Sequence, residues 1–318
     1  MVARVEIEDL RSLILKRLES LFPSEYSNRI ADIVLFGEMA GRPSHGIIRL
    51  LPGSYGVMDE ATTPVPEVHP IGPLAARVEG KQGMLVASVA TDVALDLAGD
   101  SGFAVVTVRG SRSTSGSLAY FVEKLANAGL VAFVSAGTPD FVSPPGGKGR
   151  VLGTNPLAYG IPTMEQPFIL DMATSAISGG DVLTAAATRS ELPPGVAIDE
   201  SGDGTIDPAD VLGGGAVLPF GGHKGLGLSM TVEILNKALT GATGDPGDWG
   251  HLIVAFAISL LGDEMEIRQR AQAEIERMRS AGARIPGHRT LAKRDEALER
   301  GWVDVDDDAY ERLLKAAG

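Results

Sequence analysis

A histidine and an arginine four residues apart, His45 and Arg49, are the residues of this sequence best suited to chemistry. A histidine exchanges a proton near neutral pH, and an arginine binds a carboxylate through two parallel hydrogen bonds. Together the pair suits a 2-oxo or 2-imino acid, in which the reacting double bond adjoins a carboxylate. A loop histidine followed by a surface arginine would give the same pattern, so the pair alone leaves both interpretations open.

A glycine-rich stretch, Leu218–Gly227, carries a second histidine beside a lysine, His223 and Lys224. A glycine-rich turn that leads into a helix lets backbone N–H groups and the helix dipole face an anion, and a lysine adds a point charge beside them. The stretch therefore predicts a phosphate or carboxylate site. A glycine-rich connection before a core helix is the alternative.

The helix expected after this turn covers Leu228–Leu239. It has apolar residues on two sides, which predicts that it is buried. Its charges, Glu233 and Lys237, are four residues apart and are expected to pair on one exposed strip.

Two strand-like segments end in small polar residues. Gly102–Val108 leads to the turn Ser111–Gly116, and Phe168–Met172 leads to Ala173–Ser175. Such turns place N–H groups and hydroxyls where a phosphate could lie, although turn chemistry explains the composition equally well. Asp181 follows two glycines; a general acid or base is one interpretation, but the residues favour a helix cap.

The acidic segment 199–210 approaches the spacing of a calcium-binding loop, with Gly204 at the sixth position. However, Pro193-Pro194-Gly195 precludes the helix that enters such a loop, and the twelfth residue is Asp210 instead of glutamate. The segment therefore predicts a surface turn.

Composition excludes several classes of function. The chain of 318 residues has a formal net charge of −13, which argues against nucleic-acid and membrane partners, because both require basic surface. The lack of cysteine excludes disulfides, thiolate catalysis, zinc–thiolate sites and iron–sulfur clusters. The longest apolar run, Leu252–Leu261, is half of the roughly 20 residues that a membrane helix needs. The first residues lack the apolar region of a secretory signal, so a cytoplasmic location is expected.

The order of apolar and polar segments predicts an α/β protein. No glycine-rich Rossmann fingerprint, P-loop, serine-hydrolase elbow or zincin motif occurs in the sequence. The expected elements are helices at 6–22, 24–40, 85–97, up to 128, 228–239, 265–281 and at the C-terminal end, strands at 102–108, 130–135, 168–175 and 251–258, and loops at 54–75 and 245–250. From motifs alone, the sequence predicts an α/β protein with an anion site.

Taken in order, the motifs resemble the malate/L-lactate dehydrogenase family, which binds nicotinamide cofactors on a non-Rossmann fold. The resemblance covers most of the chain and rests on the initial helices, Ser44-His45-Gly46 with Arg49, the strand-turn-helix at 103–130, Gly153-Thr154-Asn155-Pro156, Leu170–Ser175, Asp203–Pro208, Gly221–Gly225 and Pro286-Gly287. Within the family, Leu218–Gly225 and Ala176–Val182 are most similar to the branch that reduces Δ1-piperideine-2-carboxylate and Δ1-pyrroline-2-carboxylate, usually with NADPH. Malate-type members more often carry tyrosine at the position of His223 and lysine at that of Asp181.

The resemblance implies an α/β (α+β) fold of the malate/L-lactate dehydrogenase type. A non-Rossmann mixed-sheet domain, residues 76–250, would bind NAD(P). A helical second domain, formed by residues 1–75 and 251–318, would serve dimerisation and the substrate side. The implied protein is a homodimer that acts on a small anionic substrate, uses NADPH in preference to NADH, and needs no metal.

The resemblance also implies roles for individual residues. His45 would exchange the proton, and Asp181 would orient it or share that work as a second catalytic residue. Arg49 would bind the substrate carboxylate, with Ser44 beside it. The implied cofactor-binding residues are Thr114, Ser115, Gly116, Asp171, Met172, Ala173, Thr174, Ser175, His223, Lys224, Gly225 and Arg289.

Departures from the family pattern keep alternatives open. Thr114 stands where the family usually has histidine, and His288 stands where it usually has glutamate. The leading prediction is an NAD(P)H-dependent reductase of a small cyclic 2-imino acid. The alternatives are a 2-hydroxy-acid dehydrogenase of the malate, lactate or ureidoglycolate type, and a nicotinamide-nucleotide-binding homologue with weakened catalysis.

Overall fold

The computed structural model describes residues 2–51, 65–242 and 248–318. By packing, the chain forms two compact units. The first unit comprises Met1–Val134, Ala158–Asp171 and Ile253–Gly318, and the second comprises Ser135–Leu157 and Met172–Leu252. The functional domains expected at residues 76–250 and at 1–75 with 251–318 remain a prediction.

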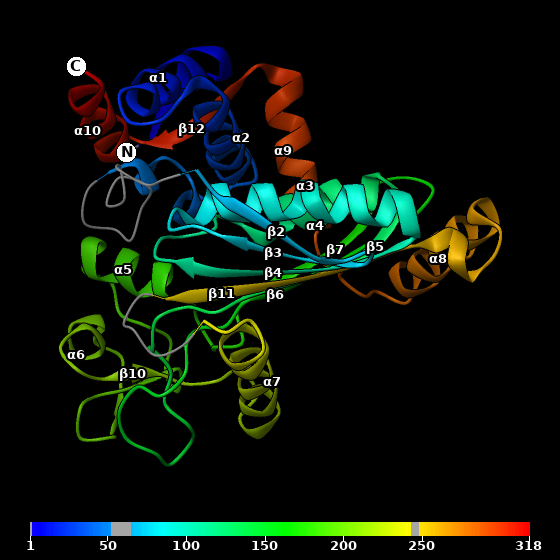
Figure 1. The fold of residues 1–318 in the computed structure, drawn as a ribbon. Helices are drawn as coiled ribbons and strands as arrows, with labels where there is room; N and C mark the ends of the chain where they lie inside the picture. The colour runs from blue at the N-terminus through cyan, green and yellow to red at the C-terminus, as the bar shows by residue number, and fades with distance from the viewer. Residues whose placement is uncertain (1, 52–64, 243–247) are drawn as a thin grey trace. The chain divides into compact units, whose positions relative to one another are not determined.

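A seven-stranded mixed sheet is the framework of the first unit (Figure 1). Its strands, in spatial order, are β2 (Glu67–Gly72), β3 (Ala75–Glu79), β4 (Phe103–Ser111), β11 (Trp249–Ala257), β5 (Leu130–Ala136), β6 (Leu157–Ile161) and β7 (Phe168–Met172). β2 pairs antiparallel with β3, whereas β3 pairs parallel with β4. This order departs from that of a Rossmann sheet. The expected mixed α/β, non-Rossmann fold class is therefore confirmed.

Two helices, α3 (Gly83–Ser101) and α4 (Leu118–Asn127), lie along one face of this sheet (Figure 1). The Gln82 side chain starts α3 by accepting a hydrogen bond from Leu85 N at 2.7 Å. Gly102, in the left-handed conformation with φ +78°, ends α3 and leads directly into β4. The turn that follows β4 lies directly before α4 in the chain, and it contacts Gly83 at the start of α3.

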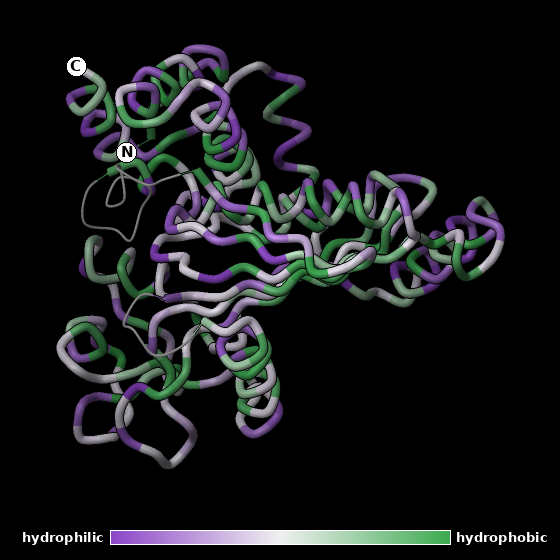
Figure 2. Tube along the Cα trace, in the orientation of Figure 1, coloured by the Kyte–Doolittle hydropathy of each residue, from purple (hydrophilic) through white to green (hydrophobic). Residues whose placement is uncertain are grey.

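A helical layer in the same unit is formed by both ends of the chain. It contains α1 (Ile7–Glu19), α2 (Ser24–Met39), α9 (His288–Arg300) and α10 (Asp307–Ala317). Two short strands, β1 (Val2–Glu6) and β12 (Trp302–Asp306), pair antiparallel and join the two ends. Apolar side chains of α1 and α2 pack together in the buried core, whereas α9 is largely hydrophilic (Figure 2).

The first unit is completed by short helical turns and one long helix. The turns η1 (Pro43–His45) and η2 (Ile47–Leu50) follow α2, and η5 (Ile258–Leu261) follows β11. The long helix, α8 (Glu264–Ser280), is mostly exposed, and its one fully buried residue among those described is Ile275.

The second unit has a core of its own, which includes Val142, Val182, Val211 and Val217. Around this core lie the strands β8 (Ala197–Ile198), β9 (Gly204–Thr205) and β10 (Ala216–Val217), in the order β10-β8-β9, and the helices α5 (Gly179–Thr188), α6 (Pro208–Leu212) and α7 (His223–Glu233). A π-helical turn, η4 (Ile234–Ala238), continues α7.

Most expected elements are confirmed within two or three residues of their ends, but several details are wrong. The chain begins with β1 instead of a helix at residue 6, and β2 lies inside the expected loop 54–75, of which residues 54–64 fall outside the described part of the chain. Of the expected loop 245–250, residues 245–247 also fall outside it, and β11 already begins at Trp249. The C-terminal end holds α9, β12 and α10 where one helix is expected.

The helix after the glycine-rich turn also differs from expectation. It begins at His223, five residues earlier than expected, and the segment is only partly buried: Val232 is buried, whereas Ile234 and Leu239, which follow α7, are 55% and 68% exposed. The expected ion pair between Glu233 and Lys237 is confirmed, but not on an exposed strip, because the two side chains are only 16% and 32% exposed.

The acidic segment 199–210 forms a surface turn, as expected. Asp199 Oδ1 accepts a hydrogen bond from Asp203 N at 3.0 Å, and Asp207 Oδ1 caps α6 by accepting one from Ala209 N at 2.8 Å. Because these carboxylates serve the local backbone, the turn explains the acidic spacing without a metal ion.

Candidate active site

The first unit brings Ser44, His45 and Arg49 together on one turn. Ser44 Oγ lies 3.1 Å from His45 Nδ1, and Arg49 Nε donates a 2.6 Å hydrogen bond to the carbonyl oxygen of Ser44. Burial lowers the pKa of the Arg49 guanidinium, which nevertheless remains protonated at neutral pH. His45 ends η1 and Arg49 lies in η2, which follows after Gly46, and Ser44 contacts both residues.

The turn after β4 packs against the helices of the same unit. Ser113 Oγ accepts hydrogen bonds from Gly83 N at 2.8 Å and Gln82 Nε2 at 3.2 Å. Gly116 has a φ of +79°, and a Cβ there would lie 2.5 Å from Ile33 of α2. Thr114 Oγ1 accepts a hydrogen bond from Gly116 N at 3.1 Å, so its hydroxyl helps to shape the turn. Like Thr114, Ser115 is half-buried.

Asp171, expected beside the cofactor, connects the end of β7 to the start of α4. Its Oδ2 accepts hydrogen bonds from Ser117 Oγ at 2.8 Å and Ala119 N at 3.0 Å. Burial raises the pKa of the Asp171 carboxyl, although these two hydrogen bonds act in the opposite direction. The side chain therefore fixes the position at which β7 meets the helix.

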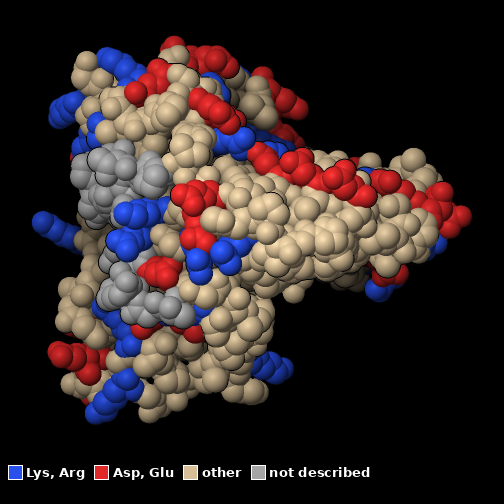
Figure 3. All heavy atoms as spheres, in the orientation of Figure 1, with Lys and Arg blue, Asp and Glu red and all other residues tan. Residues whose placement is uncertain are grey.

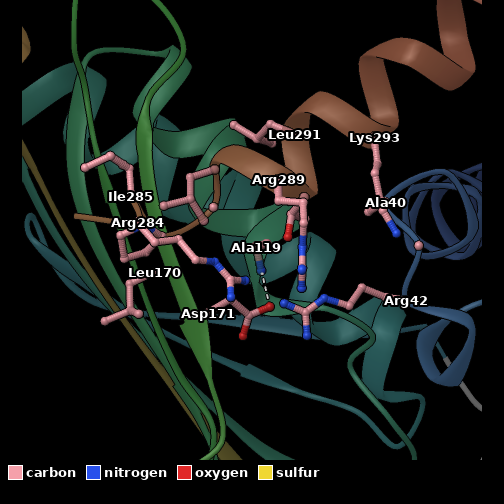
Figure 4. A pocket seen from close by; sticks show the side chains of 15 residues that line it. Ala40, Arg42, Ala119, Leu170, Asp171, Arg284, Ile285, Arg289, Leu291 and Lys293 are labelled. Carbon is pink, nitrogen blue, oxygen red and sulfur yellow. Dashed lines mark hydrogen bonds between the residues drawn. The ribbon is translucent and has the colours of Figure 1, made fainter. Parts of the chain in front are cut away.

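A cationic cavity of about 270 Å³ adjoins Asp171 in the first unit (Figure 4). Besides Asp171, its charged lining residues are Arg42, Arg284, Arg289 and Lys293. Among the described residues, none of these four cations forms an ion pair, whereas Arg11, Arg29 and Arg294 of the same unit all do. Figure 3 shows acidic side chains over the layer that holds α3, where Asp92, Asp96 and Asp100 recur every four residues.

The gathering of these cations in a chain of net negative charge indicates a binding site for an anion. Sequence analysis identified Arg289 alone among the four. The others could not be found from spacing, because Arg42 follows α2 and Lys293 lies in α9, about 250 positions further along the chain.

In the second unit, the segment after β7 runs beside the glycine-rich stretch. Thr174 donates to the carbonyl oxygen of Thr154 from both its N and its Oγ1, at 2.9 and 3.1 Å. Phe220 N donates in turn to Thr174 O at 3.1 Å, and Ser175 forms a bridge with Pro219. Met172, Ala173, Thr174 and Ser175 are therefore held next to the turn that carries His223 and Lys224.

The glycine-rich turn itself is open. Gly221 and Gly222 have φ values of +58° and +64°, and a Cβ at either position would find no atom within 4 Å. His223 and Lys224 are exposed in the first turn of α7. Gly225 is the opposite case, because a Cβ there would lie 1.9 Å from Phe220 O. The space at Gly221 and Gly222 and the helix start behind them fit the anionic part of a nucleotide.

Asp181 forms a capping box at the start of α5. Its Oδ2 accepts a hydrogen bond from Ser178 N at 3.0 Å, and its own N donates to Ser178 Oγ at 3.1 Å. The cap that the residues favour is confirmed. Its catalytic role, implied by the resemblance, stays a prediction.

Sequence analysis missed the part that Glu233 plays in the second unit. Its Oε2 accepts hydrogen bonds from Asn155 Nδ2 and from Gly153 N, so the side chain joins α7 to the turn at 153–155. Asn155 is buried with a φ of +43°. A glutamate four residues before a lysine signals a surface pair and gives no sign of this second partner.

Within the described part of the chain, no cluster of three or more His, Asp or Glu side chains could hold a metal ion. None of the helices in that part is both long enough and apolar enough to cross a bilayer.

A family model described as malate/L-lactate dehydrogenase matches residues 5–314. A Δ1-pyrroline-2-carboxylate/Δ1-piperideine-2-carboxylate reductase of Pseudomonas putida is 35% identical and aligns with 100% of this chain and 98% of its own length. A malate/(S)-sulfolactate dehydrogenase of Methanothermus fervidus is 31% identical, with 98% of this chain and 96% of its own covered.

Solved structures agree with these relatives. The crystal structure of Δ1-piperideine-2-carboxylate reductase from Pseudomonas syringae pv. tomato has a TM-score of 0.86 at 30% identity, covering 99% of both chains. Malate dehydrogenase from Pyrococcus horikoshii has a TM-score of 0.88 at 27% identity, covering 100% of this chain and 96% of its own.

Proposed function

The chain belongs to the malate/L-lactate dehydrogenase family of NAD(P)-dependent oxidoreductases, and we propose that it reduces the C=N bond of a small cyclic 2-imino acid with NADPH. The observation that carries the proposal is the placement of His45 and Arg49 on one turn, with Ser44 contacting both. The choice of an imine is supported by the reductase of Pseudomonas putida, which aligns over this whole chain.

In this proposal, the residues of the turn bind the substrate and move one proton. The Arg49 guanidinium binds the carboxylate, which orients the adjacent C=N carbon and raises its effective concentration. Because Ser44 Oγ contacts Nδ1 of His45, we assign proton transfer to Nε2, which protonates the substrate nitrogen. When bound, the nicotinamide cofactor supplies the hydride that the carbon accepts, and the product is a cyclic amino acid.

Within the first unit, the cationic cavity fits the cofactor. It is lined by Arg42, Arg284, Arg289 and Lys293, and its volume of about 270 Å³ suits a ribose and its phosphates. The lining sets these four cations against one carboxylate, Asp171, and arginine is typical of sites that accept the additional 2′-phosphate of NADP. Within the second unit, the open turn at Gly221 and Gly222, followed by Lys224, fits an anionic group by itself.

A 2-hydroxy-acid dehydrogenase is the second candidate. His45 and Arg49 would serve an oxo acid equally well, since a carbonyl also needs a proton and an adjacent carboxylate needs the same arginine. The dehydrogenase of Methanothermus fervidus, at 31% identity, supports this alternative.

A nucleotide-binding protein with weakened catalysis is the third candidate. Thr114 occupies the position where the family usually has histidine, and its hydroxyl accepts a hydrogen bond from Gly116 N. A contact to the nicotinamide would then be changed or missing.

Oxidation of NADPH with a panel of acceptors tests the proposal. We expect turnover with Δ1-piperideine-2-carboxylate and Δ1-pyrroline-2-carboxylate at a higher kcat/KM than with oxaloacetate or pyruvate. Turnover of the oxo acids alone would contradict it in favour of the second candidate. Binding of NADPH, followed by fluorescence, without oxidation by any acceptor would favour the third.

Oligomeric state and location complete the proposal. We propose a homodimer, which light scattering coupled to gel filtration would identify by its mass, and a cytoplasmic location, which fractionation would test.

A further inference from the structure

A buried glutamate of α2, Glu38, lies directly beneath the turn that carries His45. Its side chain is 5% exposed, and its Oε1 accepts a 2.7 Å hydrogen bond from Ile47 N. Within the described part of the chain it forms no ion pair, unlike another buried acid of this unit, Glu123, which pairs with Arg294. A carboxyl group buried without a counter-charge costs free energy, so its retention needs a reason.

The turn is built closely around this carboxyl group. A Cβ on Gly46 would lie 1.9 Å from Glu38 Oε1, and a Cβ on Gly37 would lie 2.5 Å from the carbonyl oxygen of His45. Glycine at both positions allows the backbone of the turn to rest on α2. The carboxyl group of Glu38 therefore contacts the turn immediately after the histidine.

We propose that Glu38 is a positioning residue for His45: by holding Ile47 N and filling the space beside Gly46, it sets the direction in which the imidazole leaves the turn. The inference rests on the proposed role of His45 as the proton donor. Glu38 itself touches neither substrate nor cofactor in this account, and it acts through the backbone of residues 45–47.

The ionisation state of the Glu38 carboxyl group depends on pH. Burial raises the pKa of Glu38 to about 7, the hydrogen bond from Ile47 N acts to lower it, and the negative charge of Asp306 on β12 raises it. The charged groups on the other elements packed against α2 include Arg11 on α1, Asp92 on α3, Lys293 and Arg294 on α9, and His45 and Arg49 on η1 and η2. Arg11, Asp92 and Arg294 form ion pairs elsewhere.

Ionisation of Glu38 strengthens its hydrogen bond, because a carboxylate is a better acceptor than a carboxylic acid. However, burial without a counter-charge outweighs this gain and raises the pKa of Glu38, so ionisation favours opening of the turn to water. The turn is therefore held more firmly below pH 7 than above it. Glutamine at this position would keep an acceptor for Ile47 N while removing the titration, and alanine would remove both.

Hydrogen–deuterium exchange of the peptide that covers residues 44–51 tests this role of Glu38 without reference to turnover. In the wild type, protection of this peptide, corrected for intrinsic exchange, should fall between about pH 6 and pH 8. Glu38→Gln should abolish that fall, and Glu38→Ala should lose the protection at both pH values. Equal protection in all three proteins would overturn the proposal.

Kinetics then separate positioning from a purely structural role. With whichever imino or oxo acid the wild type reduces, Glu38→Gln should lower kcat about 10-fold and Glu38→Ala about 100-fold, since small displacements of a reacting group cost this much. The KM for NADPH should not change. Wild-type kcat in both variants, or a loss of kcat that follows only a loss of thermal stability, would contradict the proposal.

A matched control is Glu123→Gln, which removes the charge of a buried acid on α4. It should lower stability, because it leaves Arg294 without its carboxylate partner, yet leave exchange at residues 44–51 as in the wild type. If the wild type reduces no acceptor, the proposed function fails while the exchange experiment still decides the role of Glu38.

Discussion

The two turns that carry the candidate histidines are built in opposite ways. Around His45, backbone and carboxyl groups approach so closely that no side chain fits at Gly37 or Gly46. Around His223, the glycines Gly221 and Gly222 take positive φ values with empty space beside them. The conformation of the first turn is determined by packing within the protein, whereas the second turn leaves space for a bound group.

In the proposed function, this difference corresponds to separate roles for the two turns. A group that transfers a proton benefits from a fixed direction, and the turn at residues 43–49 supplies it through buried contacts. In the proposed function, residues 221–224 would receive an anionic group, for which the open space at Gly221 and Gly222 is suited. The following predictions test whether the roles differ in this way.

Loss of the two histidines should have unequal effects. His45→Ala should reduce kcat about 1,000-fold while leaving the affinity for NADPH nearly intact, since a proton donor contributes between about 10² and 10⁴ to the rate. His223→Ala should lower kcat far less and act mainly on binding. Steady-state kinetics and NADPH titration measure both; comparable losses of kcat in the two variants would remove the contrast between the turns.

Stability should respond to pH through the packed turn. The pKa of Glu38 is raised from 4.5 to about 7 in the fold, so the protonated form is favoured there. The stability that this group contributes is complete below pH 4.5 and is lost as pH rises through about 7. Glu38→Gln should therefore gain on the wild type by up to about 3 kcal/mol between acidic pH and about pH 8.

Denaturant unfolding at several pH values measures this difference. A gap between the two proteins that stays constant with pH would show that Glu38 does not titrate in the fold.

Replacement of glycine by alanine should destabilise the protein in both turns, but for different physical reasons. Gly46→Ala should lose about 1–3 kcal/mol of stability by collision with Glu38, and much of that loss should be recovered in the double variant with Glu38→Ala. Gly222→Ala should lose a similar amount through backbone strain, because nothing lies within 4 Å of its Cβ.

The double variant of Gly222→Ala with Glu38→Ala is the control, and its losses should simply add. If the losses of stability from Gly46→Ala and Glu38→Ala also simply add, the close packing of that turn has no energetic consequence.

Removal of one cation from the cavity should have the smallest effect. Arg289→Ala should raise the KM for NADPH about 10-fold and leave the KM for NADH nearly unchanged, because one charge-assisted contact to the additional phosphate would be lost. Equal changes for both cofactors would assign Arg289 to the shared part of the nucleotide.

Local patterns in the sequence were sufficient for part of this account. The spacing of His45 and Arg49 survives in the structure because both lie on one turn, and the ion pair of Glu233 with Lys237 depends on helix geometry alone. Similarly, the position of Asp181 after two glycines was sufficient to predict its part in the cap of α5.

Features that depend on distant segments could not be predicted. The strand β1 pairs with β12, some 300 residues later, and five residues give no periodicity to reveal it. In the sequence, Glu38 resembles a surface residue of an amphipathic helix. Its burial depends on the turn that follows α2 and packs against it. The apolar pattern of residues 228–239 predicted burial, yet in the described part of the unit Ile234 and Leu239 remain largely exposed.

Hydrogen–deuterium exchange of the wild type with and without NADPH tests the contrast between the two turns most directly. The account predicts that the peptide containing residues 44–49 is already protected without the cofactor and changes little when NADPH is added. The peptide containing residues 221–225 should exchange fast alone and become protected on binding. Fast exchange at 44–49 in the free protein, or no change at 221–225 with saturating NADPH, would contradict it.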